Sequence, residues 1–330
     1  MKHFLLVIAA AISLNGIAAN HEKEYRKITE RYDVPVEVRD LDNPTAAVFW
    51  QTMLKNNDAL RKFEKDMRKN RGAEKEALNE LKSLPKFYPR YSMLVDRGMQ
   101  PYCDSLMSEM GLPETPAKSA MYIIFDPKPA AFNVATDDGF AICVTSGLLD
   151  RPGLNRDMLK GIAACGYAHG ALQHELRNFY KAAKDKRRNR WIGAALVVGE
   201  LGLAVTSDYL DYKYNNNPWG YTDNSVNIQN NTVIVNDDPE QTSGPTLYAT
   251  IFTPDQIYEA DMAAFRFMEE MGNADSYIEA LKLMGADNDS AYAGYPDHPS
   301  TANRIALLEF IREHPEIRNT ENIKIRLKGY

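Results

Sequence analysis

Apolar residues in the first third of the chain recur every three or four positions, and charged residues fill most of the positions between them. This spacing places the apolar side chains on one face of a helix. Asn43-Pro44 predicts where the first helix begins, because Asn caps helices and Pro is tolerated in the first turn. Further helices are predicted over Glu74–Leu84 and Tyr102–Met110. We therefore interpret residues 20–116 as an N-terminal helical segment whose apolar stripe packs into a core, with an extended or partly ordered stretch up to about Asp42.

The middle of the chain changes to short apolar runs that are typical of strands. Met121–Phe125 and Phe140–Thr145 are two such runs, and the turn Asp137-Asp138-Gly139 predicts that they form a hairpin. A single long helix is then predicted over Asp157–Lys184. The polar residues 206–250 are expected to form an irregular insertion with one strand, Thr232–Val235.

Helical spacing returns near the end of the chain, over Asp255–Met271, Ala274–Met284 and Thr301–Glu313. Helices thus outnumber strands, and the strands are short. The pattern predicts an α+β fold that is mostly helical and contains a small antiparallel sheet. Residues 117–330 are expected to form one domain.

Residues 1–19 have the organisation of a secretory signal peptide. The basic start Lys2-His3 precedes the apolar run Phe4–Ile12, and the small residues Gly16–Ala19 suit cleavage. No Cys lies directly after the expected cleavage site, so a bacterial lipid anchor is not expected. We expect an exported protein, either periplasmic or secreted.

Composition and charge exclude some partners. The chain has 330 residues, 44% hydrophobic and 25% charged, which suffices for a sizeable core. Its net charge of −6 argues against nucleic acid as a general partner. The three cysteines Cys103, Cys143 and Cys165 are too few for a disulfide framework. One bridge with one thiol left over and three free thiols both fit this count.

Two neighbouring segments bear on membrane contact. Lys181–Arg190 is locally basic, and we interpret it as a solvated helix end, with a docking patch for an acidic partner or a membrane surface as the alternative. Trp191–Val205 is apolar for about 15 residues, whereas a membrane span needs roughly 20. Glu200 interrupts it. A buried helix is favoured, and peripheral contact with a membrane is the second interpretation.

The candidate chemistry lies in the stretch from Cys165 to His174. Cys165 and His169 are four residues apart and share one helix face. Thiolate and imidazole both bind zinc, and His298 or His174 would complete such a site. In the alternative, Cys165 is a small buried apolar residue. A Cys165–His169 nucleophile–base pair is disfavoured, because groups one turn apart on one helix seldom both face a substrate.

Three segments in order resemble the zinc metallopeptidases of the HtpX, BepA and CAAX-prenyl-protease kind. They are Asn133–Leu149, the Cys165–His174 helix, and Tyr258-Glu-Ala-Asp261 followed by His298-Pro-Ser-Thr301 and Arg304-Ile305. The resemblance covers roughly Met121–Glu313. It implies a zincin-like fold to which the N-terminal helical segment is added.

The departures from that family concern the catalytic motif HExxH. The resemblance places its first His at Cys165, its catalytic Glu at Gly166 and its second His at His169. The third zinc ligand, a Glu in the family, corresponds to Ile257, and Asp261 keeps a position that supports the ligands. His174-Glu175-Leu-Arg-Asn178 imitates the motif in another register, but Asn is a poor zinc ligand.

These substitutions decide the expected function. A general base contributes ~10²–10⁴-fold in rate, and catalytic zinc normally keeps three protein ligands. We therefore expect no catalytic residue at Gly166 and no cofactor, with zinc on His169, Cys165 and His298 as the alternative. The resemblance implies a catalytically inactive homologue whose cleft binds a peptide or an envelope protein. The competing hypothesis is an active or divergent zinc metalloendopeptidase.

Overall fold

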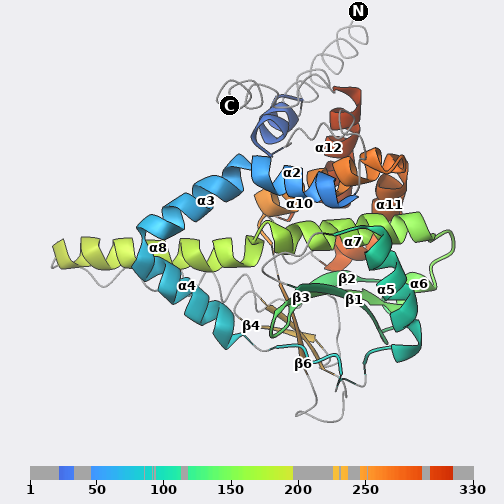
Figure 1. Ribbon diagram of the computed structural model, residues 1–330, viewed down its shortest axis with the longest axis horizontal. Helices are drawn as coiled ribbons and strands as arrows, with labels where there is room; N and C mark the ends of the chain where they lie inside the picture. Colours follow the sequence, from blue (N-terminus) through green and yellow to red (C-terminus); the bar gives the residue numbers. More distant parts are fainter. Residues whose placement is uncertain are drawn as a thin grey trace, which may run out of the picture.

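The structure is a computed structural model, and it describes residues 22–32, 46–84, 86–90, 92, 94–112, 118–195, 226–229, 232–236, 246–250, 252–291 and 298–314. The proposed signal peptide lies outside these residues, as does most of Trp191–Val205. The described chain is mostly helical and carries one sheet (Figure 1). It therefore has the predicted α+β composition.

The sheet is mixed rather than antiparallel. Its strand order is β1-β3-β2-β6-β5-β4. The strands are β1 (Lys118–Ile124), β2 (Ala131–Ala135), β3 (Gly139–Thr145), β4 (Val226–Gln229), β5 (Thr232–Asn236) and β6 (Thr246–Thr250). The pair β1–β3 is parallel and all other pairs are antiparallel.

Two predictions about strands were wrong. The first two apolar runs do not form a hairpin with each other, because β2 lies between them in the chain and takes the hairpin with β3. The turn at Asp137-Asp138-Gly139 therefore joins β2 to β3. The stretch 206–250 was expected to hold one strand, and it holds three. The predicted strand at Thr232–Val235 is confirmed as β5.

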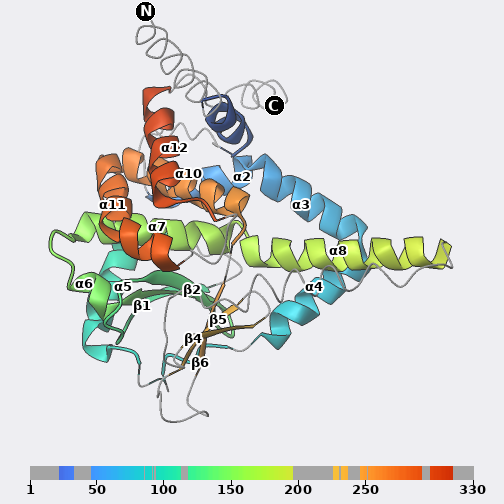
Figure 2. The same cartoon turned by 180° about the vertical axis from the view of Figure 1, so that it is seen from behind.

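The helices lie above the sheet and beside it in the views of Figures 1 and 2. Residues 22–32, which were expected to be extended or partly ordered, form a helix. The remaining helices are α2 (Ala46–Asn56), α3 (Asp58–Lys69), α4 (Arg71–Ser83), η1 (Arg97–Met99), α5 (Gln100–Glu109), α6 (Ser146–Leu149), α7 (Arg156–Ala171), α8 (His174–Ala195), α10 (Pro254–Glu270), α11 (Ala274–Ala291) and α12 (Thr301–Glu313). None of the helices in the described ranges has the length and apolar composition of a bilayer span.

The long helix predicted over Asp157–Lys184 is broken. It ends at Ala171 and a new helix begins at His174. Gln173 between them has a φ of 57°, in the left-handed region that ends helices. Its N–H bonds to the carbonyl of Gly170 at 2.9 Å, which closes the last turn of α7. The break places His169 and His174 on two different helices.

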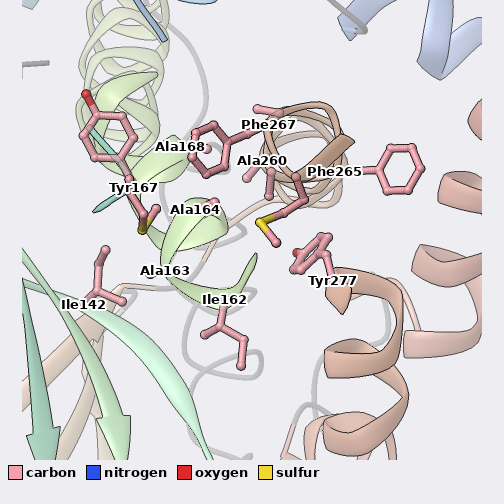
Figure 3. Close-up of a cluster of buried hydrophobic side chains, with 14 of the residues drawn as sticks. Ile142, Ile162, Ala163, Ala164, Tyr167, Ala168, Ala260, Phe265, Phe267 and Tyr277 are labelled. Atoms are coloured by element: carbon pink, nitrogen blue, oxygen red, sulfur yellow. The ribbon is translucent and has the colours of Figure 1, made fainter. Parts of the chain in front are cut away.

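α7 is the central helix of the molecule. It lies between the sheet on one side and α10 and α11 on the other (Figure 1). Its small residues, such as Ala163, Ala164 and Ala168, are fully buried and let the neighbouring elements approach closely. Figure 3 shows Phe267 of α10 and Tyr277 of α11 beside this helix, whereas Phe265 points to the far side of α10.

Helices of the N-terminal segment share this core. Phe49 and Trp50 of α2 are fully buried and contact Phe267 of α10, with ring centroids 5.6 and 5.2 Å away. The basic run on α8 is partly neutralised by α3 and α4, since Lys184 pairs with Asp66 at 2.5 Å and Lys186 with Glu76 at 3.0 Å.

Candidate functional site

The residues singled out by the sequence surround one cavity. It has a volume of about 110 Å³ and lies between β2, α7, α10, α11 and the residues before α12. Cys165, Gly166, His169, Ile257 and His298 all line it. Residues that lie more than 130 positions apart in the sequence thus meet, as the order of the three motifs predicted.

Asp261 lies beside this cavity in a fully buried network. Both its oxygens accept hydrogen bonds from Arg304, at 2.8 Å from Nε and 2.7 Å from Nη2. Tyr277 donates to Oδ1 at 2.6 Å, and the thiol of Cys165 lies 3.7 Å from the same oxygen. Asp261 therefore anchors three elements, α7, α11 and α12, to α10.

Cys165 is held as a thiol by its surroundings. Burial, followed by the negative charge of Asp261, raises the pKa of Cys165 to about 12. Cys103 and Cys143 are also free, and both are buried. The structure thus has three free thiols, which was one of the two alternatives that the cysteine count allowed.

The second cluster joins His169 to α8 and α10. Nδ1 of His169 lies 2.9 Å from Nδ1 of His174, and Nε2 of His174 lies 3.1 Å from Oε2 of Glu259. Arg177 and Asn57 donate to Glu259 at 2.8 Å each. His169 lines the cavity, whereas His174 and Glu259 are buried behind it.

Burial decides the charge of each member of this cluster. It lowers the pKa of His169 well below its ordinary value, and the neighbouring His174 and Arg304 add to this. Burial also lowers the pKa of His174, more than its bond to Glu259 raises it. For Glu259, the bonds from His174 and the charge of Arg177 outweigh burial and lower the pKa to about 2. The cluster therefore contains a carboxylate and two neutral imidazoles.

The donor set does not fit a catalytic zinc ion. Zinc binds thiolate, neutral imidazole or carboxylate, whereas Cys165 is a thiol held towards Asp261 and Ile257 offers no ligand atom. His174 does not line the cavity, and both its ring nitrogens are engaged. In the described part of the chain, no three His, Cys, Asp or Glu side chains converge as metal ligands would.

Neighbouring carboxylates do not replace the missing ligand. Asp255 accepts a hydrogen bond from Tyr32 at 2.7 Å, away from the cavity. Glu259 faces His174 and likewise does not line the cavity. Both residues are two positions from Ile257, and residues two positions apart on a helix do not share a face.

Gly166 is set close against the sheet. A Cβ atom at this position would lie 2.9 Å from Oδ1 of Asn133 and 2.9 Å from Cγ2 of Ile142. Nδ2 of Asn133 donates to the carbonyl oxygen of Gly166 at 2.7 Å, which fixes the close approach of β2 to α7. The position that corresponds to the catalytic Glu thus has no room for a side chain in this packing.

Gly166→Ala is expected to lower the free energy of unfolding by about 1–3 kcal/mol, because overpacking strains a dense core. Urea unfolding followed by circular dichroism measures this. Gly285→Ala is the matched control, since its Cβ would find its nearest neighbour at 3.3 Å. Equal stability of Gly166→Ala and the wild type would show that β2 can move away from α7.

A larger groove adjoins the cavity. It has a volume of about 1210 Å³ and runs between α3 and α4, the β2–β3 hairpin and the start of α8. His169, Phe252 and Asn133 line both spaces, so the cavity and the groove are neighbours. The ring of Phe252 stacks on that of His169, with centroids 3.6 Å apart and planes 22° apart.

The groove is lined by apolar and by charged side chains. Leu78, Leu81 and Leu84 come from α4 and the residue after it, and Val134 and Phe140 come from the hairpin. The basic residues and one acid come from α2 to α4 and the residues that follow, and the other acids come from the hairpin and the start of α8. The basic residues are Lys55, Arg61, Lys82 and Lys86, and the acids are Glu64, Asp137, Asp138 and Glu175.

Sequence reasoning assigned no role in the site to Arg304, Glu259 or Phe252. Arg304 carried a signal, because the buried positions of α12 include Thr301, Arg304, Leu308 and Ile311 at helical spacing. A charged residue on an apolar face needs a buried partner. Glu259 carried no comparable signal, since most of α10 is buried on every side.

Comparison with known proteins adds no family. No model of a known protein family matches the chain, and no curated protein shows significant similarity to it. The resemblance to zinc metallopeptidases therefore remains a prediction, and it depends on the motif residues.

Proposed function

We propose that this protein is an exported, catalytically inactive relative of zinc metallopeptidases that binds a peptide or an envelope protein in its groove. One observation carries the proposal. The three positions where the family would place its first zinc ligand, its general base and its third zinc ligand line one cavity, and they hold a thiol, no side chain and an isoleucine. None of the described residues that line this cavity carries a carboxylate that could act as general base.

The groove supports the binding role. Its volume exceeds the roughly 300–1,000 Å³ of small-molecule pockets, which suits several residues of an extended peptide. The leucines of the groove would cover apolar side chains of the peptide, and burying one such side chain contributes about 1.5–3 kcal/mol. The charged residues of the groove would orient the bound peptide.

We expect an unstructured, fluorescein-labelled peptide of alternating leucine and alanine to bind the mature protein saturably, without being cleaved. Fluorescence anisotropy measures the binding, and mass spectrometry of the recovered peptide detects cleavage. Leu81→Glu is expected to weaken binding roughly tenfold or more, because it removes an apolar contact. Lys75→Glu is the matched control, since this exposed residue of α4 does not line the groove.

Two results would contradict the proposal. Cleavage of casein that a chelator abolishes would identify an active metallopeptidase instead. Peptide affinity that Leu81→Glu and Lys75→Glu change equally would show that the groove is not the binding surface.

A further inference from the structure

Three polar atoms at the cavity form no hydrogen bond with the residues that the structure describes. The first is Nη1 of Arg304. This side chain is buried and donates hydrogen bonds from Nε and Nη2 to Asp261. Nη1 forms no hydrogen bond with any residue that the structure describes, and Arg304 lines the cavity. A guanidinium nitrogen can only donate, so the cavity presents a hydrogen-bond donor here.

The second atom is Nε2 of His169, and the hydrogen bonds behind it determine its role. Glu259 is a carboxylate and only accepts, so Nε2 of His174 must donate to it. His174 is neutral, which leaves its Nδ1 without a proton. Nδ1 of His169 must therefore donate to Nδ1 of His174. In the neutral ring of His169 the remaining nitrogen, Nε2, is then a hydrogen-bond acceptor.

The third atom is Oδ1 of Asn133. Its amide nitrogen donates to the carbonyl of Gly166, and this bond fixes which end of the amide is the oxygen. Across the described residues Oδ1 accepts no hydrogen bond, and Asn133 lines the cavity. The cavity thus combines one donor, Arg304, with two acceptors, His169 and Asn133.

A primary carboxamide matches this set. Its oxygen accepts one or two hydrogen bonds, and its nitrogen donates two. The oxygen would take the bond from Arg304, and the two N–H groups would serve His169 and Asn133. A carboxylate of the same shape has no proton to donate, and it would bring oxygens against both acceptors.

The size and the rest of the lining agree with such a group. A cavity of about 150 Å³ holds benzene, with six non-hydrogen atoms. By that scale the 110 Å³ here holds about four to five non-hydrogen atoms, close to the size of propionamide or of a glutamine side chain. Ile162, Ile257 and Leu281 supply an apolar surface for the methylene groups.

We propose that the cavity is a binding site for a primary carboxamide, held by Arg304, His169 and Asn133. The inference rests on the proposed function, because the natural source of the group is a glutamine or asparagine side chain of a peptide in the groove. His169, Phe252 and Asn133 line both spaces, so a side chain that reaches the cavity from the groove has to pass between these three residues. The site selects one residue of the peptide, whereas the groove holds its apolar neighbours.

Propionamide and propionate are matched probes, since they differ only in the amide nitrogen. Calorimetric titration of the full mature chain is expected to show propionamide binding at least about tenfold tighter, because leaving buried polar groups unpaired costs about 1–3 kcal/mol. Nitrogen NMR of the histidine rings is expected to show a shift of His169 Nε2 on addition of propionamide. Equal binding of both probes, tighter binding of propionate or no binding of propionamide would overturn the proposal.

Filling the cavity provides a second test. Ile257→Phe is expected to abolish propionamide binding without removing a hydrogen-bonding group. Ile305→Phe is the matched control, because Ile305 packs against the core but does not line the cavity. Unchanged propionamide binding in folded Ile257→Phe would place the ligand elsewhere and overturn the proposal.

Binding of peptides distinguishes a side-chain amide from a free amide as the ligand. It also distinguishes failure of the carboxamide site from failure of the proposed function. Peptides ending in an N-methylamide, with Gln, Glu or Ala at the central position, are compared. A preference for Gln that Ile257→Phe removes identifies a side chain as the source, while propionamide binding without this preference identifies a free amide. Equal binding of the three peptides, with no binding of propionamide, would overturn this inference and leave the proposed function standing.

Discussion

Asp261→Ala is expected to lower the free energy of unfolding by about 3–5 kcal/mol, the cost of leaving one partner of a buried ion pair without the other. Asp261 is fully buried, and Arg304 forms two hydrogen bonds with it. The substitution would strand the guanidinium and leave Tyr277 without its acceptor. The midpoint of urea unfolding, followed by circular dichroism, measures the loss.

Asp275→Ala is the matched control. Asp275 pairs with Arg312 at 2.8 Å, but its side chain is 81% exposed. Exposed ion pairs contribute about 0–1 kcal/mol, so this substitution should change stability little. Similar losses in both variants would mean that the Asp261–Arg304 pair contributes no more than a surface pair.

The folded protein is expected to lose stability steadily as the pH falls from about 6.5 to 4. Burial, together with the charge of Arg304, lowers the pKa of His298 from 6.5 to about 4. The pKa values of His169 and His174 are lowered as well. In the unfolded chain these rings take up protons near pH 6.5, whereas the folded state keeps them neutral. Their contribution to stability is thus complete above about pH 6.5 and declines below it.

Glu259 extends the loss to lower pH. Its pKa is lowered to about 2, so its contribution is complete above about pH 4.5 and is lost as the pH falls towards 2. For His298 alone the loss amounts to up to about 3 kcal/mol, since each tenfold change in proton affinity corresponds to about 1.4 kcal/mol.

Urea unfolding at about pH 7.5, 6 and 5 measures this dependence. His298→Gln should reduce the slope of the free energy of unfolding against pH by the equivalent of about one proton. Lys282→Gln, a change on the exposed face of α11, should leave the slope as in the wild type. A free energy of unfolding that stays constant between about pH 7 and 5 would contradict the neutral state of the three rings.

Helices with a clear apolar period were predicted well from the sequence. The predicted Asp255–Met271 and Thr301–Glu313 differ from α10 and α12 by at most one residue at either end. Thr253 and Ser300 cap these helices with their side chains, so local chemistry and packing agree on where each begins.

Strand pairing and the helix break were not predictable in the same way. Apolar alternation identifies a strand but not the direction of its partner, and β1 therefore looked like one arm of a hairpin. β2 (Ala131–Ala135) is short and contains two alanines, which have low β-propensity. The break at Gln173 has no Gly or Pro to announce it, and it is determined by tertiary contacts of His174 instead.

For the candidate site, the sequence predicted which residues meet but not how they bond. Cys165, His169, Ile257 and His298 face one cavity, as the motif order implied. The pairing of Asp261 with Arg304 depends on the crossing of α10 and α12, which no local pattern encodes. The chain from His169 through His174 to Glu259 likewise required the break at Gln173.

That break also lies between a large hydrophobic cluster and a small one. The cavity belongs to the large core around α7 and α10, whereas the far part of α8 packs on α4 through a small cluster around Ala73, Ala77, Tyr180 and Ala183. Phe63 contacts both clusters. Local opening begins where few apolar groups are buried. The helical wall of the groove can therefore open locally while the cavity keeps its shape. Substitutions can then change the width of the groove without changing the selectivity of the cavity.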